Sequence, residues 1–582
     1  TKKRLEEMLR LVCIAIWVVH AYAKPHGPSV IPPENPDDPV YLHPGHSKSV
    51  LVIGGGLAGL SAALELAERG VRVVLKEVDE YVGGRVKARR TIPRHHGDSD
   101  EPGWFNGTVS VEHGFHAWFK NYYQMKDVRD RLGVSHLYRP WPAVHYRFRH
   151  YKPEVIHSEG PYPLNLLRIV RESPNLSVLD AVRSLGSIKE LAFFDYTTVF
   201  NRLDNVTFEQ WAKSVSILKR FYDIIFAPSL SVTLNERGTL SAAEMLTYQQ
   251  LYFLSDPHAS DREVATADYG TALLNPWVDR LRSLGAQVIT NASVDALDVT
   301  LDQHSGELRA AGSVDVGGGH YDGVVIAADL KAVQRILKRT VEHTQKDTAA
   351  SQAILSRLSA LSDRVNALPI APPYKVIRVW LDQPLNADRP DIMETPDWSP
   401  VNLVAQYHML EDDASEWAKR TGGAVVEFHC YTWTRPDTRD EEVWGVIRPT
   451  VVMILPEVEE RSIRVVGYHV ESHHNFPSFS RGTNAARPNF DTPLQQANIT
   501  NLAFAGDWLR PTYPSALMER AVSTGRQAAN LLLKRFGVQQ VPLVVPPTNG
   551  PGLPFGAGVD GGNTKGERGG RGTGGDEALI HA

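Results

Sequence analysis

Near the start of the chain, hydrophobic residues occur in short runs on either side of a segment with helical spacing. Val50–Ile53 is an apolar run of strand length, and Leu57–Arg69 has helical periodicity with small residues on one face. Val71–Leu75 is a second apolar run, which ends at the acidic Glu77. This order predicts a strand, a helix and a second, parallel strand.

Glycines occupy the turn between the first strand and the helix. Gly54, Gly56 and Gly59 form the pattern G-x-G-x-x-G. The first glycine permits a tight turn, the second lets the backbone approach a diphosphate, and the third lets the helix pack close to the strand. The diphosphate would lie at the helix N-terminus, where unpaired N–H groups favour negative charge. Glu77 stands close to the offset of about 20 residues expected of a carboxylate that binds ribose hydroxyls. The unit therefore predicts a dinucleotide site.

Two further stretches resemble the FAD-dependent amine oxidase and phytoene desaturase superfamily. Gly83-Gly84-Arg85 follows the second strand, and Leu502-Ala-Phe-Ala-Gly506-Asp507 precedes Pro514–Gly525 near the C-terminus. The resemblance implies that FAD is the cofactor and that Asp507 meets its ribityl or phosphate part. The cofactor-binding residues predicted in this way are Gly54, Gly56, Leu57, Ala58, Gly59, Glu77, Gly84, Arg85, Gly114, Phe115, Val294, Gly506, Asp507, Ala516, Leu517 and Met518.

The segment Val111–Phe119 resembles the Glu-x-Gly-x-His-x-Phe-Phe stretch of carotenoid desaturases, which passes beside the isoalloxazine ring. A buried strand with aromatic packing is the alternative. His116 is the candidate catalytic residue, either taking a proton or hydrogen-bonding the flavin, and a purely structural histidine remains open. For Glu519, at the start of the last helix, we expect a structural role, because acids are stabilised near helix N-termini.

The predicted fold class is α/β, with a discontinuous Rossmann-like FAD-binding domain and an interleaved α+β substrate domain. A helix at Asn275–Leu284 and a strand at Val288–Thr290 lead to Val294, which the resemblance places beside the adenine, and Asp322–Ala328 is typical of a buried parallel strand. The predicted divisions are a signal-like or anchor segment (1–24), a linker (25–47), FAD-binding parts (48–130, 265–330 and 490–537), substrate parts (131–264 and 331–489) and a disordered Pro/Gly-rich tail (538–582).

Between these parts, the chain is rich in apolar and aromatic residues. Ile188–Phe200 and Ile217–Leu230 have helical spacing, which is typical of core helices but also suits the walls of a tunnel for a long apolar substrate. Residues 374–381 alternate as a half-buried strand does.

Three stretches narrow the resemblance to the bacterial carotenoid ring desaturase/methyltransferase branch, the isorenieratene synthase type. They are Gln406–Trp417, Val425–Tyr431 and Met518–Gly525. The resemblance, over about residues 48–537, implies an FAD-dependent oxidoreductase that desaturates a carotenoid or similar isoprenoid by hydride transfer to flavin N5. Ring desaturation with a methyl shift is one form of this reaction. A flavin amine oxidase and a non-catalytic flavoprotein subunit of a membrane assembly are the alternatives.

Composition and the N-terminus bear on partners and location. The net charge of −5 gives no reason to expect nucleic acid as a partner. The two cysteines, Cys13 and Cys430, exclude a disulfide framework or a cysteine-rich metal site within this sequence. The paired histidines 95–96 and 473–474 lack ligands at suitable spacing, so we predict no metal. Leu11–Ala23 is apolar but shorter than the roughly 20 residues needed to span a bilayer. A signal peptide, a shallow membrane anchor and a helix packed on the protein remain open.

The expected partners are an apolar isoprenoid or carotenoid, a membrane surface, and a quinone or oxygen as electron acceptor. The expected location is the membrane surface, or a secreted or lumenal one if residues 1–23 are a signal peptide.

Overall fold

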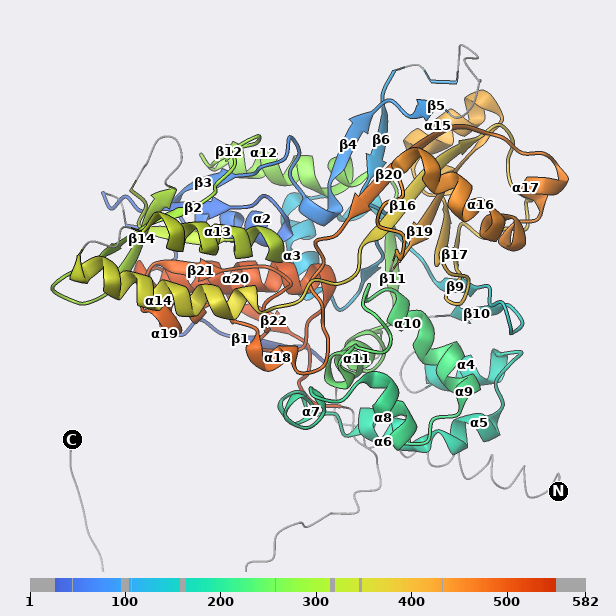
Figure 1. The fold of residues 1–582 in the computed structure, drawn as a ribbon, viewed down its shortest axis with the longest axis horizontal. Helices are drawn as coiled ribbons and strands as arrows, with labels where there is room; N and C mark the ends of the chain where they lie inside the picture. The colour runs from blue at the N-terminus through green and yellow to red at the C-terminus, as the bar shows by residue number, and fades with distance from the viewer. Residues whose placement is uncertain are drawn as a thin grey trace, which may run out of the picture. The chain divides into compact units, whose positions relative to one another are not determined.

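The computed structural model describes residues 27–550, except residues 44, 96–103, 106, 158–163, 257, 314–319, 345–347 and 432. The predicted N-terminal segment 1–24 therefore lies outside the described residues, as do residues 551–582 of the predicted tail. Two sheets organise the described chain, one parallel and one mixed, with a group of helices beside them (Figure 1).

The parallel sheet contains the predicted strand–helix–strand unit. Its order is β12-β3-β2-β15-β21, and its members are Gln287–Ile289 (β12), Arg72–Lys76 (β3), Ser49–Ile53 (β2), Gly323–Ile326 (β15) and Leu502–Phe504 (β21). All pairings in it are parallel. The helix predicted between the first two strands is Leu57–Ala67 (α2). The expected α/β class and this unit are confirmed.

Alternate residues of the parallel strands pack into different cores. Val50 and Val52 belong to one core with α2, Asn275–Ser283 (α12), Tyr123–Leu132 (α3) and Leu517–Arg535 (α20). Leu51 and Ile53 face Leu330–His343 (α13) and Ala349–Asn366 (α14). The sheet thus lies between two helical layers, as period-two side-chain alternation requires. The predicted substrate segment 331–489 contributes α13 and α14 to one of these layers.

The mixed sheet has eight strands in the order β10-β9-β17-β18-β19-β16-β20-β5. They are Glu154–His157 (β10), Ala143–Tyr146 (β9), Ile392–Glu394 (β17), Leu403–Gln406 (β18), Ala424–Cys430 (β19), Tyr374–Leu381 (β16), Val465–His473 (β20) and Arg94–His95 (β5). The half-buried strand expected at 374–381 is wrong, because all eight residues of β16 are buried. One face of the sheet packs on Val443–Ile454 (α16) and Glu457–Glu460 (α17), while Trp380 on the other face packs with Phe105, Val111 and Trp141.

Helices dominate residues 164–254. They are Leu164–Glu172 (α4), Val178–Arg183 (α5), Leu185–Ala192 (α6), Tyr196–Leu203 (α7), Phe208–Ser214 (α8), Lys219–Phe221 (α9), Ala227–Ser231 (α10) and Ala242–Gln249 (α11). The segment expected to be helical at Ile217–Leu230 contains a π-helical turn at Tyr222–Phe226 between α9 and α10. Smaller elements complete the fold: Ala88–Thr91 (β4), Val109–Glu112 (β6), Trp118–Phe119 (β7), Tyr138–Pro140 (β8), Arg262–Ala265 (β11), Leu297–Leu301 (β13), Leu308–Ser313 (β14), Asp412–Thr421 (α15), Thr483–Ala486 (α18) and Thr492–Ala497 (α19).

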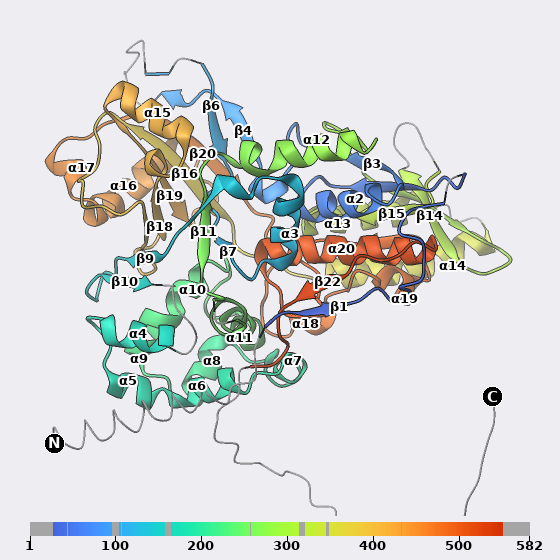
Figure 2. The same cartoon turned by 180° about the vertical axis from the view of Figure 1, so that it is seen from behind.

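Residues from the predicted linker and the predicted tail pair with each other. Ser29–Ile31 (β1) and Leu543–Val545 (β22) form an antiparallel ribbon beside α3 and α20 (Figure 2). Disorder was expected at 538–582, and for Leu543–Val545 that expectation is wrong. These apolar residues are held by partners from other parts of the chain, which local composition does not reveal.

Candidate functional site

A cavity of about 380 Å³ extends from the parallel sheet to the mixed sheet. On the first side, its walls are the segments that follow parallel strands: Gly54–Ala58 after β2, Glu77 after β3, Ala327–Asp329 after β15 and Gly506-Asp507 after β21. Ligands of open parallel sheets bind outside the carboxyl ends of the strands. The cavity is thus where this sheet would hold a dinucleotide.

Backbone geometry explains two glycines of the turn. Gly54 has φ +105°, and a Cβ there would lie 2.8 Å from the carbonyl oxygen of Ala327. A Cβ on Gly59 would lie 1.9 Å from the oxygen of Gly54. Only glycine therefore allows α2 to begin this close to the sheet, with its N-terminal N–H groups at the cavity.

Glu77 is held at the end of β3 by backbone donors. Its carboxylate accepts hydrogen bonds from the N–H groups of Gly55 at 2.6 Å and Asp79 at 2.9 Å. The residue is 8% exposed and lines the cavity, and burial raises the pKa of its carboxyl group. Each carboxylate oxygen can accept more than one hydrogen bond, so Glu77 can also accept from ligand hydroxyls.

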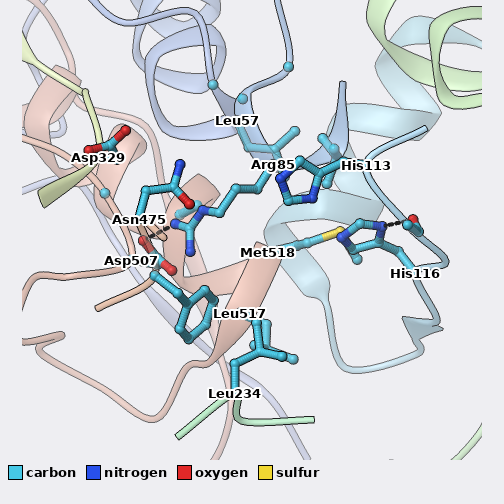
Figure 3. A pocket seen from close by; sticks show the side chains of 18 of the residues that line it. Leu57, Arg85, His113, His116, Leu234, Asp329, Asn475, Asp507, Leu517 and Met518 are labelled. Carbon is cyan, nitrogen blue, oxygen red and sulfur yellow. Dashed lines mark hydrogen bonds and ion pairs between the residues drawn. The ribbon is translucent and has the colours of Figure 1, made fainter. Parts of the chain in front are cut away.

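Arg85 crosses the middle of the cavity and forms an ion pair with Asp507 (Figure 3). Its guanidinium carbon lies 4.7 Å from the ring centre of Phe476. The Nη1 atom is buried and has no hydrogen-bond partner among the described residues. A buried guanidinium nitrogen without an acceptor fits a site for an oxygen-rich ligand, because leaving it unpaired is costly.

Residues 113–117 form another part of the cavity wall. Gly114 has φ +138°, and a Cβ there would lie 3.1 Å from Cε1 of His429. The Nδ1–H of His116 donates to the Gly114 carbonyl at 2.7 Å, as drawn in Figure 3. The His116 backbone N–H donates to the hydroxyl of Tyr269. Burial lowers the pKa of His116 to about 4, so its imidazole is neutral at pH 7. This side chain can hydrogen-bond a ligand but is a weak proton acceptor.

The structure brings nearly all predicted site residues to this one cavity. His116 and the predicted cofactor residues line it, except Gly59 and Ala516. Gly59 acts through its contact with Gly54, and Ala516 precedes α20. Their binding roles stay predictions.

The sequence analysis did not predict several residues of the cavity wall, which come from parts of the chain that are far apart in sequence. They include Tyr146, Arg262, Asp329, Tyr374, Glu394, Leu403, His429, Tyr431, Asn475 and Phe476. Two of them, His429 and Tyr431, lie in the stretch Val425–Tyr431, which the sequence analysis named, but the spacing of that stretch did not show that it faces the cavity.

Glu519 has a structural contact, in line with its predicted role. Its carboxylate accepts from the backbone N–H groups of Gln124 at 2.8 Å and Met125 at 3.0 Å, at the start of α3. Burial raises the pKa of Glu519 to about 7. Among the described residues, no group of His, Cys, Asp and Glu side chains is suited to a metal ion. His96 of the first histidine pair is outside the described residues.

The chain matches the flavin containing amine oxidoreductase family over residues 57–533. It belongs to this family. Carotenoid phi-ring synthases of Chlorobaculum tepidum and Streptomyces griseus are 27% and 29% identical to it, covering 86% and 85% of this chain and 91% and 89% of their own lengths. A 15-cis-phytoene desaturase of Arabidopsis thaliana is 22% identical over 85% of the chain and 81% of its own length. The chain is thus an FAD-dependent oxidoreductase similar in sequence to carotenoid desaturases.

Solved structures of amine oxidases share the fold. A putrescine oxidase structure has a TM-score of 0.56 at 16% identity, covering 84% of this chain and all of the other. Cyclohexylamine oxidase from Brevibacterium oxydans has a TM-score of 0.55 at 13% identity, covering 84% of this chain and 99% of the other. At these identities the likeness concerns the fold alone.

The residues of the cavity fit FAD. The α2 N-terminus and the close-packed glycine turn suit the diphosphate, Glu77 suits ribose hydroxyls, and Arg85 offers an unpaired donor. When bound, the flavin supplies the capacity to accept a hydride. The protein supplies orientation and exclusion of water through the buried walls around it.

Proposed function

We propose that this chain desaturates a carotenoid, including ring desaturation with a methyl shift. The observation that carries this proposal is that much of the cavity wall is apolar and aromatic. That wall includes Phe119, Tyr122, Trp141, Val232, Leu234, Tyr252, Phe253 and Leu403. Such a wall suits a long apolar substrate, and the sequence relatives named carotenoid phi-ring synthase support this choice.

The reaction depends on how the substrate is held beside the flavin. A hydride leaves one carbon of the substrate for the flavin, and a proton leaves its neighbour, so the wall must chiefly orient the carbon chain. In a ring with a gem-dimethyl carbon, a 1,2-methyl shift to an adjacent cation permits aromatisation. Buried aromatic rings of the wall such as Tyr122 and Tyr252 suit a developing positive charge.

Amine oxidation is the second candidate, and Glu394 is the observation in its favour. This carboxyl group lines the inner cavity, where it could hold an ammonium group. Burial raises its pKa to about 7, although the nearby Arg262 opposes this shift. Arg262 already supplies a positive charge there, and Lys76, at the end of β3, is the only lysine among the described lining residues. Amine oxidation is therefore a less favoured function than carotenoid desaturation.

The test is pigment analysis of a β-carotene-producing host that expresses the full chain, by chromatography with mass detection. We expect a pigment lighter by four hydrogens for each aromatised ring, with the absorption spectrum of an aromatic end group. Unchanged β-carotene in cells that contain the yellow flavoprotein would overturn ring desaturation. Reduction of the purified protein's flavin by putrescine or cyclohexylamine would favour the amine candidate.

We further propose that the protein works at a membrane surface, because a carotenoid resides in the bilayer, and that a quinone or oxygen reoxidises the flavin. Among the described residues, no helix is long and apolar enough to cross a bilayer. Co-sedimentation with lipid vesicles, and anaerobic reoxidation by a soluble quinone, test the two parts separately.

A further inference from the structure

Two side chains of strand β19 and one from the residue directly after it form a hydrogen-bonded line along the cavity wall. Glu427, His429 and Tyr431 stand at alternate positions, so they share one face of the sheet. His429 Nε2 lies 2.8 Å from Glu427 Oε1, and the Tyr431 hydroxyl lies 3.2 Å from His429 Nδ1. His429 and Tyr431 line the cavity, whereas Glu427 is 1% exposed and stands behind them.

Strand register places His429 in the middle of the substrate wall. Its partners across the sheet are Val376 on β16 and Leu403 on β18, and Leu403 is in turn opposite Glu394 on β17. All four residues line the cavity. On its open side, the imidazole of His429 packs against Gly114, in the segment that the resemblance places beside the flavin. A substrate carbon held beside this segment would therefore lie next to His429 and Tyr431.

Glu427 is built to remain an anion. Arg378, directly opposite it on β16, donates from Nε to Glu427 Oε2 at 2.9 Å, and the Phe115 N–H donates to Oε1 at 3.1 Å. Burial alone would raise the pKa of Glu427, but Arg378 and His429 hold it at about 2. The Phe115 N–H lies 3.3 Å from His429 Nε2 and closer to the Glu427 oxygen, at 3.1 Å. Because the Glu427 anion is only 2.8 Å from Nε2, we assign the imidazole proton to Nε2, which leaves Nδ1 to accept from the hydroxyl of Tyr431.

We propose that Tyr431, His429 and Glu427 take up the proton that each desaturation removes; this rests on the proposed carotenoid function. One C–H bond breaks with both electrons leaving as hydride to the flavin. The neighbouring C–H bond breaks heterolytically, and its electron pair becomes the new C=C bond. The released proton goes to the Tyr431 oxygen while the Tyr431 proton passes to His429 Nδ1. Glu427 then stabilises the imidazolium. Tyr431 and His429 are the catalytic residues, and Glu427 is a positioning residue.

Two more carboxyl groups lie beside Arg378. Arg378 also lies 3.5 Å from Glu112 and 3.7 Å from Glu411. Burial raises the pKa of Glu112 to about 7 and that of Glu411 well above its usual value, so the pair holds a proton near neutral pH. The charged and titratable groups around His429 are Glu427 on its own strand, Tyr431 directly after that strand, Arg378 on β16, Glu394 on β17, and Glu112 and His116 in the facing segment.

The test measures flavin reduction by β-carotene in single turnover without oxygen, on the FAD-loaded full chain. We expect H429Q to slow reduction about 100-fold or more, the scale of general acid–base catalysis. Y431F and E427Q should also slow reduction, with FAD content and the apparent affinity for β-carotene unchanged. The matched control is H145Q on β9 of the same sheet, whose ring is not part of the cavity wall.

The outcomes separate the inference from the function on which it rests. A wild type whose flavin β-carotene does not reduce would overturn both. An active wild type with H429Q and Y431F within twofold of it would overturn the proton relay alone. Loss of FAD from H429Q, at unchanged reduction rate of the remaining loaded fraction, would assign His429 a structural role against Gly114 and overturn the relay.

Discussion

Gly59 packs so closely on the carbonyl group of Gly54 that adding a single Cβ atom at this position tests the role of the glycine turn. A Cβ on Gly59 would lie 1.9 Å from that oxygen, whereas a Cβ on Gly238 would meet nothing within 4 Å. We expect G59A to push α2 away from the sheet, lower the free energy of unfolding by about 1–3 kcal/mol and reduce FAD content. G238A should change neither. Flavin absorbance per protein and urea unfolding are the measurements, and full FAD occupancy in G59A would contradict the argument.

For Arg85 and Asp507, the contribution of their ion pair to stability can be measured separately from their predicted contacts with the cofactor. The Arg85 side chain is half-buried, whereas Asp507 is only 5% exposed. Removing one partner leaves the other charge buried, so R85M should destabilise the apoprotein by about 3 kcal/mol. The double variant R85M/D507N should recover part of that stability but none of the FAD affinity. Recovery of both would mean that the pair acts on FAD only through folding.

At the scale of secondary structure, individual helices and strands with a local sequence pattern were predictable, whereas the pairing of strands far apart in the chain was not. Strand β2, helix α2 and strand β3 lie within two or three residues of the expected bounds, because their apolar periodicity and glycines are local signals. The cavity wall of Val376, Leu403, Glu394 and His429 depends on pairing between strands far apart in the chain. No local pattern specifies that register, so this part of the cavity wall could not be predicted from the sequence.

Helix α3 depends on a carboxyl group from helix α20, and this contact predicts a pH effect on stability. Burial raises the pKa of Glu519 from about 4.5 to about 7, so between these values the folded state binds more protons than the unfolded state. Stability from this group must then fall as pH rises from about 4.5 to 7 and level off above, by up to about 3 kcal/mol. E519Q should flatten this part of the profile, measured by urea unfolding at pH 5.5 and 8. An unchanged slope would assign the effect to Glu112 or Glu394, whose pKa values burial also raises to about 7.

At the scale of the whole molecule, the two sheets contribute different parts of the wall of one cavity. The parallel sheet contributes the ends of strands assembled from three separate segments, and the mixed sheet contributes a flat face of alternating polar and apolar side chains. This separation explains why family members of similar fold can act on different molecules: the first sheet can stay constant while the second sheet's face changes.

The ribbon of β1 and β22 connects parts of the chain on either side of the cofactor-binding core, and it should contribute to global stability. Before β22, the backbone of Val541 exchanges two hydrogen bonds with the buried Asn530 side chain of α20, at 2.7 and 2.8 Å. The Gln124 side chain of α3 donates to the Val544 carbonyl at 2.6 Å.

N530A would leave the Val541 groups unpaired, and we expect the free energy of unfolding to fall by about 2–3 kcal/mol. N366A is the control, because among the described residues the exposed Asn366 side chain bonds only to Ser362, within its own helix. Ending the chain at residue 537 should cost more than N530A, and ending it at 550 should cost little, as measured by thermal unfolding of the FAD-loaded protein. Equal unfolding temperatures for the two shortened chains would show that β22 adds nothing to the stability of the fold.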